Sequence, residues 1–451
     1  MAVTIQTTLN YLILIATAGN LFLHQLIPIA AAAAATYNIL DLGAEVDDGG
    51  MAWAATNSNS NSNSNSNSSS NSNSLVEAWS SACASTKPST IHIPQGRFLL
   101  KSPLHFKGPC ANKAITLHID GTLVNAIRRH NYSNTNSNYW FLFEGVDGIS
   151  IRGAGTLDGQ GAALWACKQS AADATLCPSG LTTLGLWNSR NVVMSGLRWV
   201  NSEMFHIVID GCENVRVEEV KVAAAGESPN TDGIHVQMSK WVEIVKARVG
   251  TGDDCVSVGP GTANLRVEGV ECGPGHGISI GSLGKEYEEG GVENVTVENA
   301  VFRGTQNGFR IKTWGRPSRG FVRNVLFDRA LMDHVRNPIL IDQNYCPDHR
   351  NDAARSCPPQ GRGLQVSGVQ ISGVTYRDIR GTSATQVAVK FECSKANPCR
   401  GIRLDNVNLS YDVDDNDNQN RSQRAAQSSC SNAAGTSFGH IQPSSCLFSM
   451  H

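Results

Sequence analysis

The sequence predicts an all-β fold, a parallel β-helix in which short strands stack as the coils of a solenoid. Short strands with alternating apolar residues recur from about residue 190 onward, and helix-period runs are hard to find between them. Glycine is abundant, with 43 residues among 451. Strands buried by stacking need no crossover helices, whereas a doubly wound fold would show helical patterns between its strands. An antiparallel sandwich would show hairpin turns at closer intervals.

Eight repeat units carry this strand pattern. Their sequences are RNVVMSGLRWV, ENVRVEEVKV, KWVEIVKARV, ANLRVEGVEC, ENVTVENAVF, RNVLFDRALM, SGVQISGVTY and RGIRLDNVNL. The second residues of these units lie at positions 191, 214, 241, 264, 294, 324, 368 and 401, so the steps run from 23 to 44 residues. A step of this length holds two or more short strands and suits one coil of a solenoid.

The N-terminal segment predicts secretion. Residues 11–35 are almost wholly apolar and end in small residues, so we interpret 1–35 as a signal peptide. A signal anchor stays open as an alternative, because the run approaches spanning length and lacks a basic start. His24, Gln25 and Pro28 argue against a clean span. We therefore expect an extracellular protein without stable membrane association.

Three further segments follow the signal peptide. Residues 36–56 begin an N-terminal cap, and residues 57–74 form an almost pure Asn-Ser tract. Such a tract has no apolar surface to offset chain entropy, so we expect disorder there. Residues 75–451 remain for one solenoid domain, and a chain of this length can bury a large core as a single unit.

Charge excludes nucleic acid as a partner. The 37 basic and 39 acidic residues nearly balance, with a pI near 6.6, and no strong positive field is available to neutralise phosphates. Any acidic partner must therefore be met by a local basic patch.

The cysteines fit an oxidising compartment. The 13 cysteines include four pairs at short separations: Cys167 with Cys177, Cys346 with Cys357, Cys393 with Cys399, and Cys430 with Cys446. An odd count leaves one thiol over, and we expect Cys212 to be that thiol, buried and inert. Glycosylation sequons, compatible with secretion, lie at Asn67, Asn131, Asn294, Asn408 and Asn420.

Four polar clusters interrupt the strand pattern. They are Asn230-Thr231-Asp232-Gly233, Gly252-Asp253-Asp254-Cys255, Gly275-His276-Gly277 and Arg310-Ile311-Lys312. The steps from Asp232 to Asp253, to His276 and to Arg310 are 21, 23 and 34 residues, each close to one coil. Residues one coil apart in a parallel stack lie about 4.8 Å apart. The spacing therefore predicts one vertical column on one face.

The residue types in this column favour acid-base chemistry on a sugar. Carboxylates as close as Asp232, Asp253 and Asp254 raise at least one pKa, which leaves a proton donor beside ionised partners. An inverting glycoside hydrolase needs such a pair, about 6.5–9.5 Å apart, to hold its water. Arg310 and Lys312, two apart on a strand, point the same way and suit a carboxylate-bearing sugar. Ordinary turn residues would explain each motif alone, but they do not explain why charged residues recur at the same point of four successive coils.

The motifs NTDG, GDDC, GHG and RIK, in this order and spacing, resemble the four signature motifs of polygalacturonases, glycoside hydrolase family 28. The resemblance extends from Tyr37-Asn38-Ile39-Leu40-Asp41-Leu42-Gly43-Ala44 to Asn337-Pro338-Ile339-Leu340-Ile341-Asp342-Gln343-Asn344-Tyr345-Cys346, where it is closest to plant members. It implies a right-handed β-helix of about ten coils with a short N-terminal cap helix. It also implies that a secreted protein hydrolyses the α-1,4-linked galacturonan of pectin in the cell wall, and we expect this protein to be a monomer.

The resemblance assigns a role to each candidate residue. Asp253 would be the general acid, and Asp232 and Asp254 would hold and activate the water. His276 would support the proton of the acid, and Arg310 and Lys312 would grip the galacturonate carboxylate. Asn230 would help to shape the site and Tyr345 would line the subsite. The family further implies a disulfide between Cys255 and Cys272, and no cofactor or metal.

The sequence departs from the family at the cap, where Glu45-Val46-Asp47-Asp48-Gly49-Gly50 runs into the Asn-Ser tract instead of a Gly-Asp-Gly-rich turn.

Four other functions stay open. A pectate lyase would use calcium and an arginine base, and the GDD and GHG motifs argue against it. Rhamnogalacturonan hydrolysis is less compatible with Arg310 and Lys312. A non-catalytic pectin-binding β-helix and a carboxylate-histidine metal site are the remaining alternatives.

Overall fold

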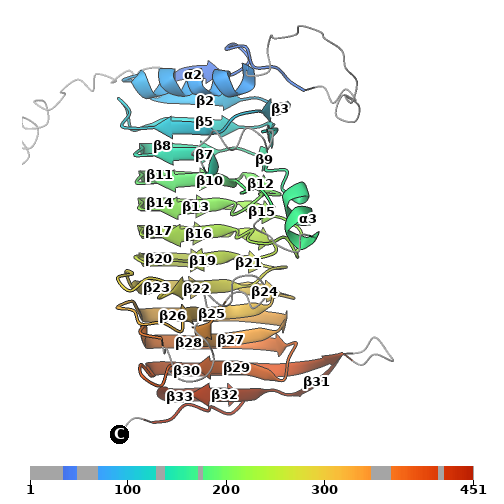
Figure 1. Ribbon diagram of the computed structural model, residues 1–451, viewed down its shortest axis with the longest axis vertical. Coiled ribbons are helices and arrows are strands. Elements are labelled where there is room, and N and C mark those ends of the chain that lie inside the picture. The colour runs from blue at the N-terminus through green and yellow to red at the C-terminus, as the bar shows by residue number, and fades with distance from the viewer. Residues whose placement is uncertain are drawn as a thin grey trace, which may run out of the picture. The chain divides into compact units, whose positions relative to one another are not determined.

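Stacked parallel strands build the fold, and each strand pairs with the equivalent strand of the next coil (Figure 1). The computed structural model describes residues 34–47, 70–127, 138–170, 176–346, 367–414 and 421–449. The chain divides into two units, residues 1–34 and 35–451, and the described strands belong to the second unit. The predicted signal peptide therefore lies almost entirely outside the described residues. No helix among the described residues is long and apolar enough to cross a membrane.

One sheet contains eleven strands, close to the predicted ten coils. Its strands are β4 (Leu104–Lys107), β7 (Tyr139–Glu144), β10 (Thr182–Trp187), β13 (Ile207–Asp210), β16 (Ile234–Gln237), β19 (Val256–Val258), β22 (Ile278–Leu283), β25 (Asn307–Trp314), β27 (Asn337–Tyr345), β29 (Val387–Glu392) and β32 (Gln427–Ser431). This sheet carries the polar clusters of the sequence.

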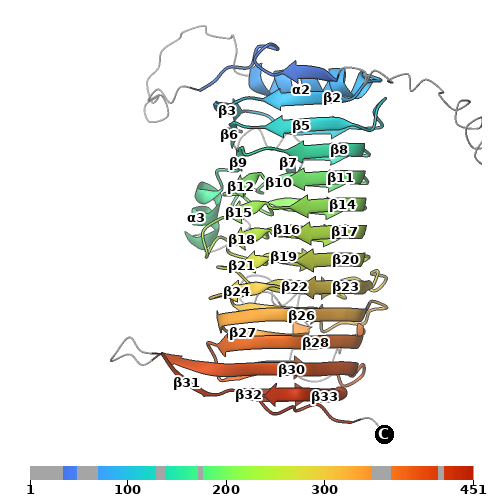
Figure 2. The same ribbon diagram turned by 180° about the vertical axis from the view of Figure 1, so that it is seen from behind.

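The second sheet has 22 strands and covers two further sides of the coils (Figure 2). One stack in it comprises β1 (Ala35–Asn38), β2 (Ser89–Ile93), β5 (Ile115–Ile119), β8 (Asp147–Arg152), β11 (Arg190–Ser195), β14 (Glu213–Glu218), β17 (Lys240–Val245), β20 (Ala263–Glu268) and β23 (Val292–Glu298). The other comprises β3 (Arg97–Leu100), β6 (Thr122–Asn125), β9 (Thr156–Asp158), β12 (Arg198–Val200), β15 (Lys221–Ala223), β18 (Arg248–Gly250), β21 (Glu271–Cys272) and β24 (Val301–Arg303).

Long strands join these two stacks toward the C-terminus. They are β26 (Phe321–Val335), β28 (Gln370–Ser383), β30 (Cys399–Asp414) and β33 (Ala433–Gln442). Among the described strands, only β31 (Arg421–Ala425) pairs antiparallel, with β30. The predicted parallel β-helix is thus confirmed.

The polar residue that opens each repeat has a structural role. Asn191, Asn214, Asn264 and Asn294 have positive φ values between 55° and 57°, a conformation that asparagine tolerates better than most residues. Their side-chain amides also bond from coil to coil; the Asn214 Nδ2 donates to the Asn191 Oδ1 at 2.7 Å. These turns let the chain bend between strands at the same point of successive coils.

One repeat is out of phase with our sequence alignment. Arg323 pairs with Ser372, and Ser372 with Arg400, so the position after Asn324 in this series is Gly373 and not Gly368. The segment contains Ser-Gly-Val twice, five residues apart, and strand pairing uses the second copy. The sequence pattern alone does not distinguish the two copies.

The helix α2 (Ser70–Ala84) lies across the β2 end of the coils and is the predicted cap (Figure 1). Its buried apolar residues are Leu75, Ala78, Trp79 and Ala82, which cover the apolar core. Residues 70–74 belong to the tract that we predicted to be disordered, and for them that prediction is wrong. The Asn71 Nδ2 donates to the backbone oxygens of Glu45 and Leu99, at 3.1 and 3.2 Å, and the Ser74 Oγ donates to that of Leu42 at 2.8 Å. These bonds offset the poor helix propensity of asparagine and serine.

Disulfides fasten several coils. The expected short-range pairs Cys167–Cys177, Cys393–Cys399 and Cys430–Cys446 are present, as is the Cys255–Cys272 bond that the family resemblance implied. Cys83 and Cys110 form a further pair, joining α2 to the following coil. Cys346 is disulfide-bonded, and its expected partner Cys357 lies outside the described residues. Cys212 is the free, buried cysteine, as predicted.

A second helix, α3 (Ala162–Ser170), was not expected from the sequence. It lies on the flank of the coils beside β12 and β15 (Figure 1), and the Cys167–Cys177 bond holds its C-terminal half.

Candidate active site

Three candidate residues stand in one column before the strands of the eleven-stranded sheet. Asp232, Asp254 and His276 each lie two residues before the first residue of their strand, which is β16, β19 or β22. The first residues of these strands, Ile234, Val256 and Ile278, are register partners. The three side chains therefore occupy the same position on successive coils, as the spacing predicted.

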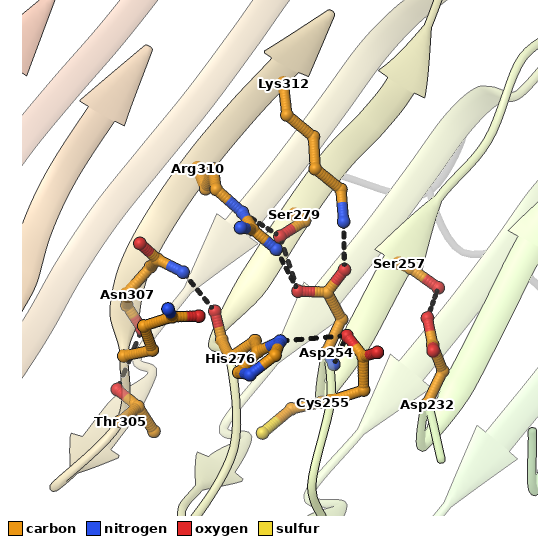
Figure 3. Close-up of polar contacts among 12 residues, drawn as sticks. Asp232, Asp254, Cys255, Ser257, His276, Ser279, Thr305, Asn307, Arg310 and Lys312 are labelled. Atoms are coloured by element: carbon orange, nitrogen blue, oxygen red, sulfur yellow. Dashed lines mark hydrogen bonds and ion pairs between the residues drawn. The ribbon is translucent and has the colours of Figure 1, made fainter. Parts of the chain in front are cut away.

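The cations lie in neighbouring columns, so the prediction of a single column is only partly right. Arg310 belongs to β25 and pairs with Ser279, which follows His276 by three residues. Lys312 lies two residues further along the same strand. The register places Asn307 opposite His276, so Arg310 lies three residues further along the strand than the column predicted for it. Both cations nevertheless reach back to the carboxylates (Figure 3).

Asp254 is the centre of the cluster and is almost fully buried. Its Oδ1 accepts hydrogen bonds from the Arg310 Nη2 at 2.8 Å and from the Ser279 Oγ at 2.7 Å. Its Oδ2 accepts one from the Lys312 Nζ at 2.8 Å. Burial alone would raise the pKa of Asp254, but the charges of Lys312 and Arg310 outweigh burial and lower this pKa to about 2. Asp254 is therefore ionised throughout the usual pH range.

Asp232 has the opposite electrostatic environment. Burial, together with the charges of Asp253 and Asp254, raises the pKa of Asp232 well above its ordinary value. Among the described residues, Ser257 alone bonds to its carboxyl group, with 2.6 Å between the Ser257 Oγ and the Asp232 Oδ2. The cluster thus contains one carboxyl group that favours its proton beside one that stays ionised, as expected for carboxyl groups this close, but the raised pKa belongs to Asp232, a predicted base.

Asp253 and His276 form the more exposed side of the cluster. The Asp253 side chain is 18% exposed, whereas that of Asp254 is 1% exposed. The His276 Nδ1 lies 3.0 Å from the Asp253 Oδ1, and the His276 backbone nitrogen donates to the Asp253 backbone oxygen at 2.8 Å. Since Asp253 is reachable from outside and is held by a histidine, it is placed to meet a ligand directly.

Tyr345 joins the cluster and Asn230 does not. The Lys312 Nζ lies 5.2 Å, and the Arg310 Cζ 6.0 Å, from the centre of the Tyr345 ring, within cation-π range. Asn230 is exposed in the turn before Asp232, with a φ of 57°. Within the described part of the chain, its side chain makes no hydrogen bond to the carboxylate cluster.

Sequence reasoning missed a set of polar residues that support the cluster. Ser257 and Ser279 bond to Asp232 and Asp254, and the His276 backbone oxygen accepts from the Asn307 Nδ2 at 2.9 Å (Figure 3). The two serines lie three residues after Asp254 and His276, and His235 lies three residues after Asp232. A polar residue repeated at that offset in an otherwise apolar strand is a signal that would have found them.

Sequence reasoning also missed His206, which supports the backbone of the site. It is fully buried, and its Nδ1 donates to the backbone oxygen of Asp232 at 3.1 Å. Burial lowers the pKa of His206 to about 4, so the ring is neutral at ordinary pH. A neutral His206 therefore fixes the main chain that carries Asp232.

A metal ion is a poor fit at this cluster. Asp253, Asp254 and His276 offer ligand atoms within 4.8 Å of one another. However, both oxygens of Asp254 already accept bonds from the cations Arg310 and Lys312. A divalent cation would have to displace them or share a carboxylate with two positive charges.

A set of acidic residues with unlike proton affinities, next to two cations on a parallel β-helix, defines a glycoside hydrolase for charged sugars. The chain belongs to glycosyl hydrolases family 28, whose model matches residues 83–432. The family membership that the four motifs suggested is thereby confirmed, as is the right-handed β-helix that it implied.

The similar proteins are plant and microbial enzymes. The chain is 52% identical over 418 residues to a polygalacturonase of Prunus persica, which covers 93% of this chain and 95% of that protein. It is 37% identical over 370 residues to an exopolygalacturonase of Platanus acerifolia, covering 82% and 92%. Among solved structures, an exopolygalacturonase from Thermotoga maritima matches at a TM-score of 0.62 and 19% identity, over 84% of this chain and 89% of that one.

Proposed function

We propose that this protein hydrolyses the α-1,4-galacturonosidic bonds of pectin by an inverting mechanism that uses two carboxyl groups. The observation that supports it best is the contact of the ionised Asp254 with both Arg310 and Lys312. These three groups together carry a net positive charge, so they attract an anionic sugar. Of the Lys312 ammonium's three donors only one bonds to Asp254, and Arg310 likewise has donors to spare for a galacturonate carboxylate.

Each acidic residue has a distinct role in this proposal. Asp253 gives a proton to the leaving oxygen, since it is the most exposed of the three and is held by His276. Asp232 and Asp254 hold the attacking water on the other side of the bond and remove its proton. Asp232 must be ionised to act as that base, although burial favours its protonated form in the resting protein. Turnover therefore requires a proton to move between the carboxyl groups or their partners.

Tyr345 lies against the two cations and forms a wall of the sugar subsite in this proposal, whereas Asn230, exposed in the turn before Asp232, would shape the site from the other end of the cluster. The expected setting is the extracellular cell wall, where the protein acts as a secreted monomer. The disulfides support an oxidising location.

The products of polygalacturonate test this function. Hydrolysis releases reducing ends without ultraviolet absorption, and a chelator leaves the rate unchanged. Unsaturated, ultraviolet-absorbing ends that vanish with chelator would instead show elimination and contradict the proposal. The anomeric form of the first product, followed by NMR, checks the inverting mechanism. Sizing the products as monomers or as a ladder of oligomers decides between cleavage from the chain end and internal cleavage.

A further inference from the structure

A chain of hydrogen bonds leads from Asp232 away from the sugar-binding cluster. The Ser257 Oγ lies 2.6 Å from the Asp232 Oδ2 and 2.7 Å from the His235 Nδ1. On the other side of the ring, the His235 Nε2 lies 3.2 Å from the Gln237 Oε1. The Gln237 Nε2 in turn donates to the Asp210 Oδ2 at 2.8 Å. The chain thus runs from one carboxyl group to another.

When the His235 ring is neutral, the donors in this chain have one consistent order. The Asp210 carboxylate only accepts, which directs the Gln237 nitrogen toward it and the Gln237 oxygen toward His235. The His235 Nε2 must therefore carry a hydrogen, and in a neutral ring the Nδ1 is then an acceptor. Ser257 has a single hydrogen and must donate it to that Nδ1. The Asp232 Oδ2 is left to donate to Ser257, so Asp232 holds a proton.

We propose that Ser257 and His235 are positioning residues that hold the proton of Asp232 and take it up when Asp232 becomes a base. This inference rests on the proposed function, because it concerns the base of that reaction. In the step, the O–H bond of Asp232 breaks as the Ser257 oxygen gains that proton. The hydrogen of Ser257 passes to the His235 Nδ1. Asp232 becomes a carboxylate, His235 an imidazolium, and the total charge is unchanged.

The surroundings explain why the resting state keeps the proton on Asp232. Burial lowers the pKa of His235, which favours the neutral ring at rest. The charged groups that act on His235 are Asp210, Asp254 and Lys312, and those that act on Asp232 are Asp253, Asp254 and Lys312. Asp210 and Asp254 stabilise an imidazolium, so the charged state of His235 is accessible. The centre of the Phe205 ring lies 5.3 Å from that of the His235 ring, so an aromatic replacement at position 235 keeps a ring beside Phe205.

Two substitutions give opposite shifts in the pH profile. Ser257→Ala removes the hydroxyl that can donate to ionised Asp232, and we expect the acidic limb of kcat/KM to move up by about one pH unit, a tenfold change in the ionisation constant. His235→Phe removes the acceptor that competes for the Ser257 hydrogen, so the acidic limb moves down. If His235 were a charged donor at rest, His235→Phe would move the limb up, and the proposal would fail.

A matched control separates this role from a structural one. Ser239→Ala removes another buried hydroxyl, which bonds only to backbone groups next to β16. We expect lower stability and no movement of either limb. Equal shifts in Ser239→Ala and Ser257→Ala would show a general packing effect and overturn the inference.

A second readout does not depend on hydrolysis. Ring nitrogen-15 NMR of the protein, with His235→Phe for assignment, should show a neutral Nε2–H ring between about pH 5 and 7. A doubly protonated ring across that range would contradict the proposal even in an active enzyme. A neutral Nε2–H ring in a protein that does not cleave polygalacturonate would contradict the proposed function and support the hydrogen-bond order.

Discussion

The Lys312 Nζ lies 2.8 Å from the Asp254 Oδ2, although 58 residues separate the two along the chain. Lys312 belongs to β25 and Asp254 precedes β19, and β22 lies between those strands in the sheet. A long side chain is needed to reach across two strand spacings. Arg310 spans the same gap to Asp254. One coil of the solenoid therefore supplies both cations to a carboxylate two coils away.

Asp254→Asn should destabilise the protein by about 3 kcal/mol at neutral pH, because it leaves Arg310 and Lys312 buried beside a neutral amide. Equilibrium unfolding in urea measures the change. Glu268→Gln is the control, since it breaks an exposed ion pair with Arg266 and should cost less than about 1 kcal/mol. Similar losses in the two variants would contradict the importance of the buried pair.

The stability due to the Asp254 charge should also depend on pH. The pKa of Asp254 is lowered in the folded state to about 2 from 3.8, so its contribution is complete above about pH 4 and disappears as the pH falls through 2. The shift corresponds to about 2 kcal/mol. The stability difference between the wild type and Asp254→Asn should therefore shrink over that acidic range. A stability difference that stays constant down to pH 2 would show that the charge of Asp254 is not its cause.

Asp232→Asn should make the folded protein more stable at neutral pH while it abolishes hydrolysis. The pKa of Asp232 is raised in the folded state, so this carboxyl group favours folding at low pH and loses that contribution as the pH rises through the raised value. A neutral amide of the same shape avoids that loss. Thermal unfolding at neutral and acidic pH gives the comparison, and a drop in Tm at neutral pH would show that the charged form is favoured.

Asp253→Asn should reduce kcat by about 10³-fold or more and leave the fold intact, because the amide cannot give a proton to the leaving oxygen. Release of reducing ends from polygalacturonate measures the rate, and the melting temperature checks the fold. Since Asp253 is the most exposed of the three acidic residues, its replacement should change the Tm less than that of Asp254. Full activity in this variant would refute its assignment as the acid.

Loss of the Cys255–Cys272 disulfide should affect both stability and activity. Cys255→Ala with Cys272→Ala opens a loop of 17 residues, for which chain entropy predicts about 3 kcal/mol. Cys255 directly follows Asp254, so we also expect a fall in kcat. The control is Cys430→Ala with Cys446→Ala, which opens a loop of 16 residues at β32, the last strand of the sheet and remote from β19. An equal fall in kcat in the control would indicate a global effect.

Much of the site was predictable because strand repeats fix the distance between coils. The spacing of Asp232, Asp254 and His276 matched the coil length, and these residues do share a column. The position of Arg310 was less predictable, because its coil contains a longer loop between β22 and β23, whose length the repeat does not fix. The phase of the repeat at Gly373 failed for a related reason: two identical tripeptides fit the pattern, and only pairing with β26 selects one.

The sequence by itself determined the solenoid, the order of the acidic clusters and the family, because periodic strands and four spaced motifs are local properties of the chain. The tertiary structure alone decided which carboxyl group stays ionised and which keeps its proton. Burial, and the contacts of Asp254 with two cations and of Asp232 with Ser257, set those states. They depend on side chains from separate coils, whose distances no linear spacing contains.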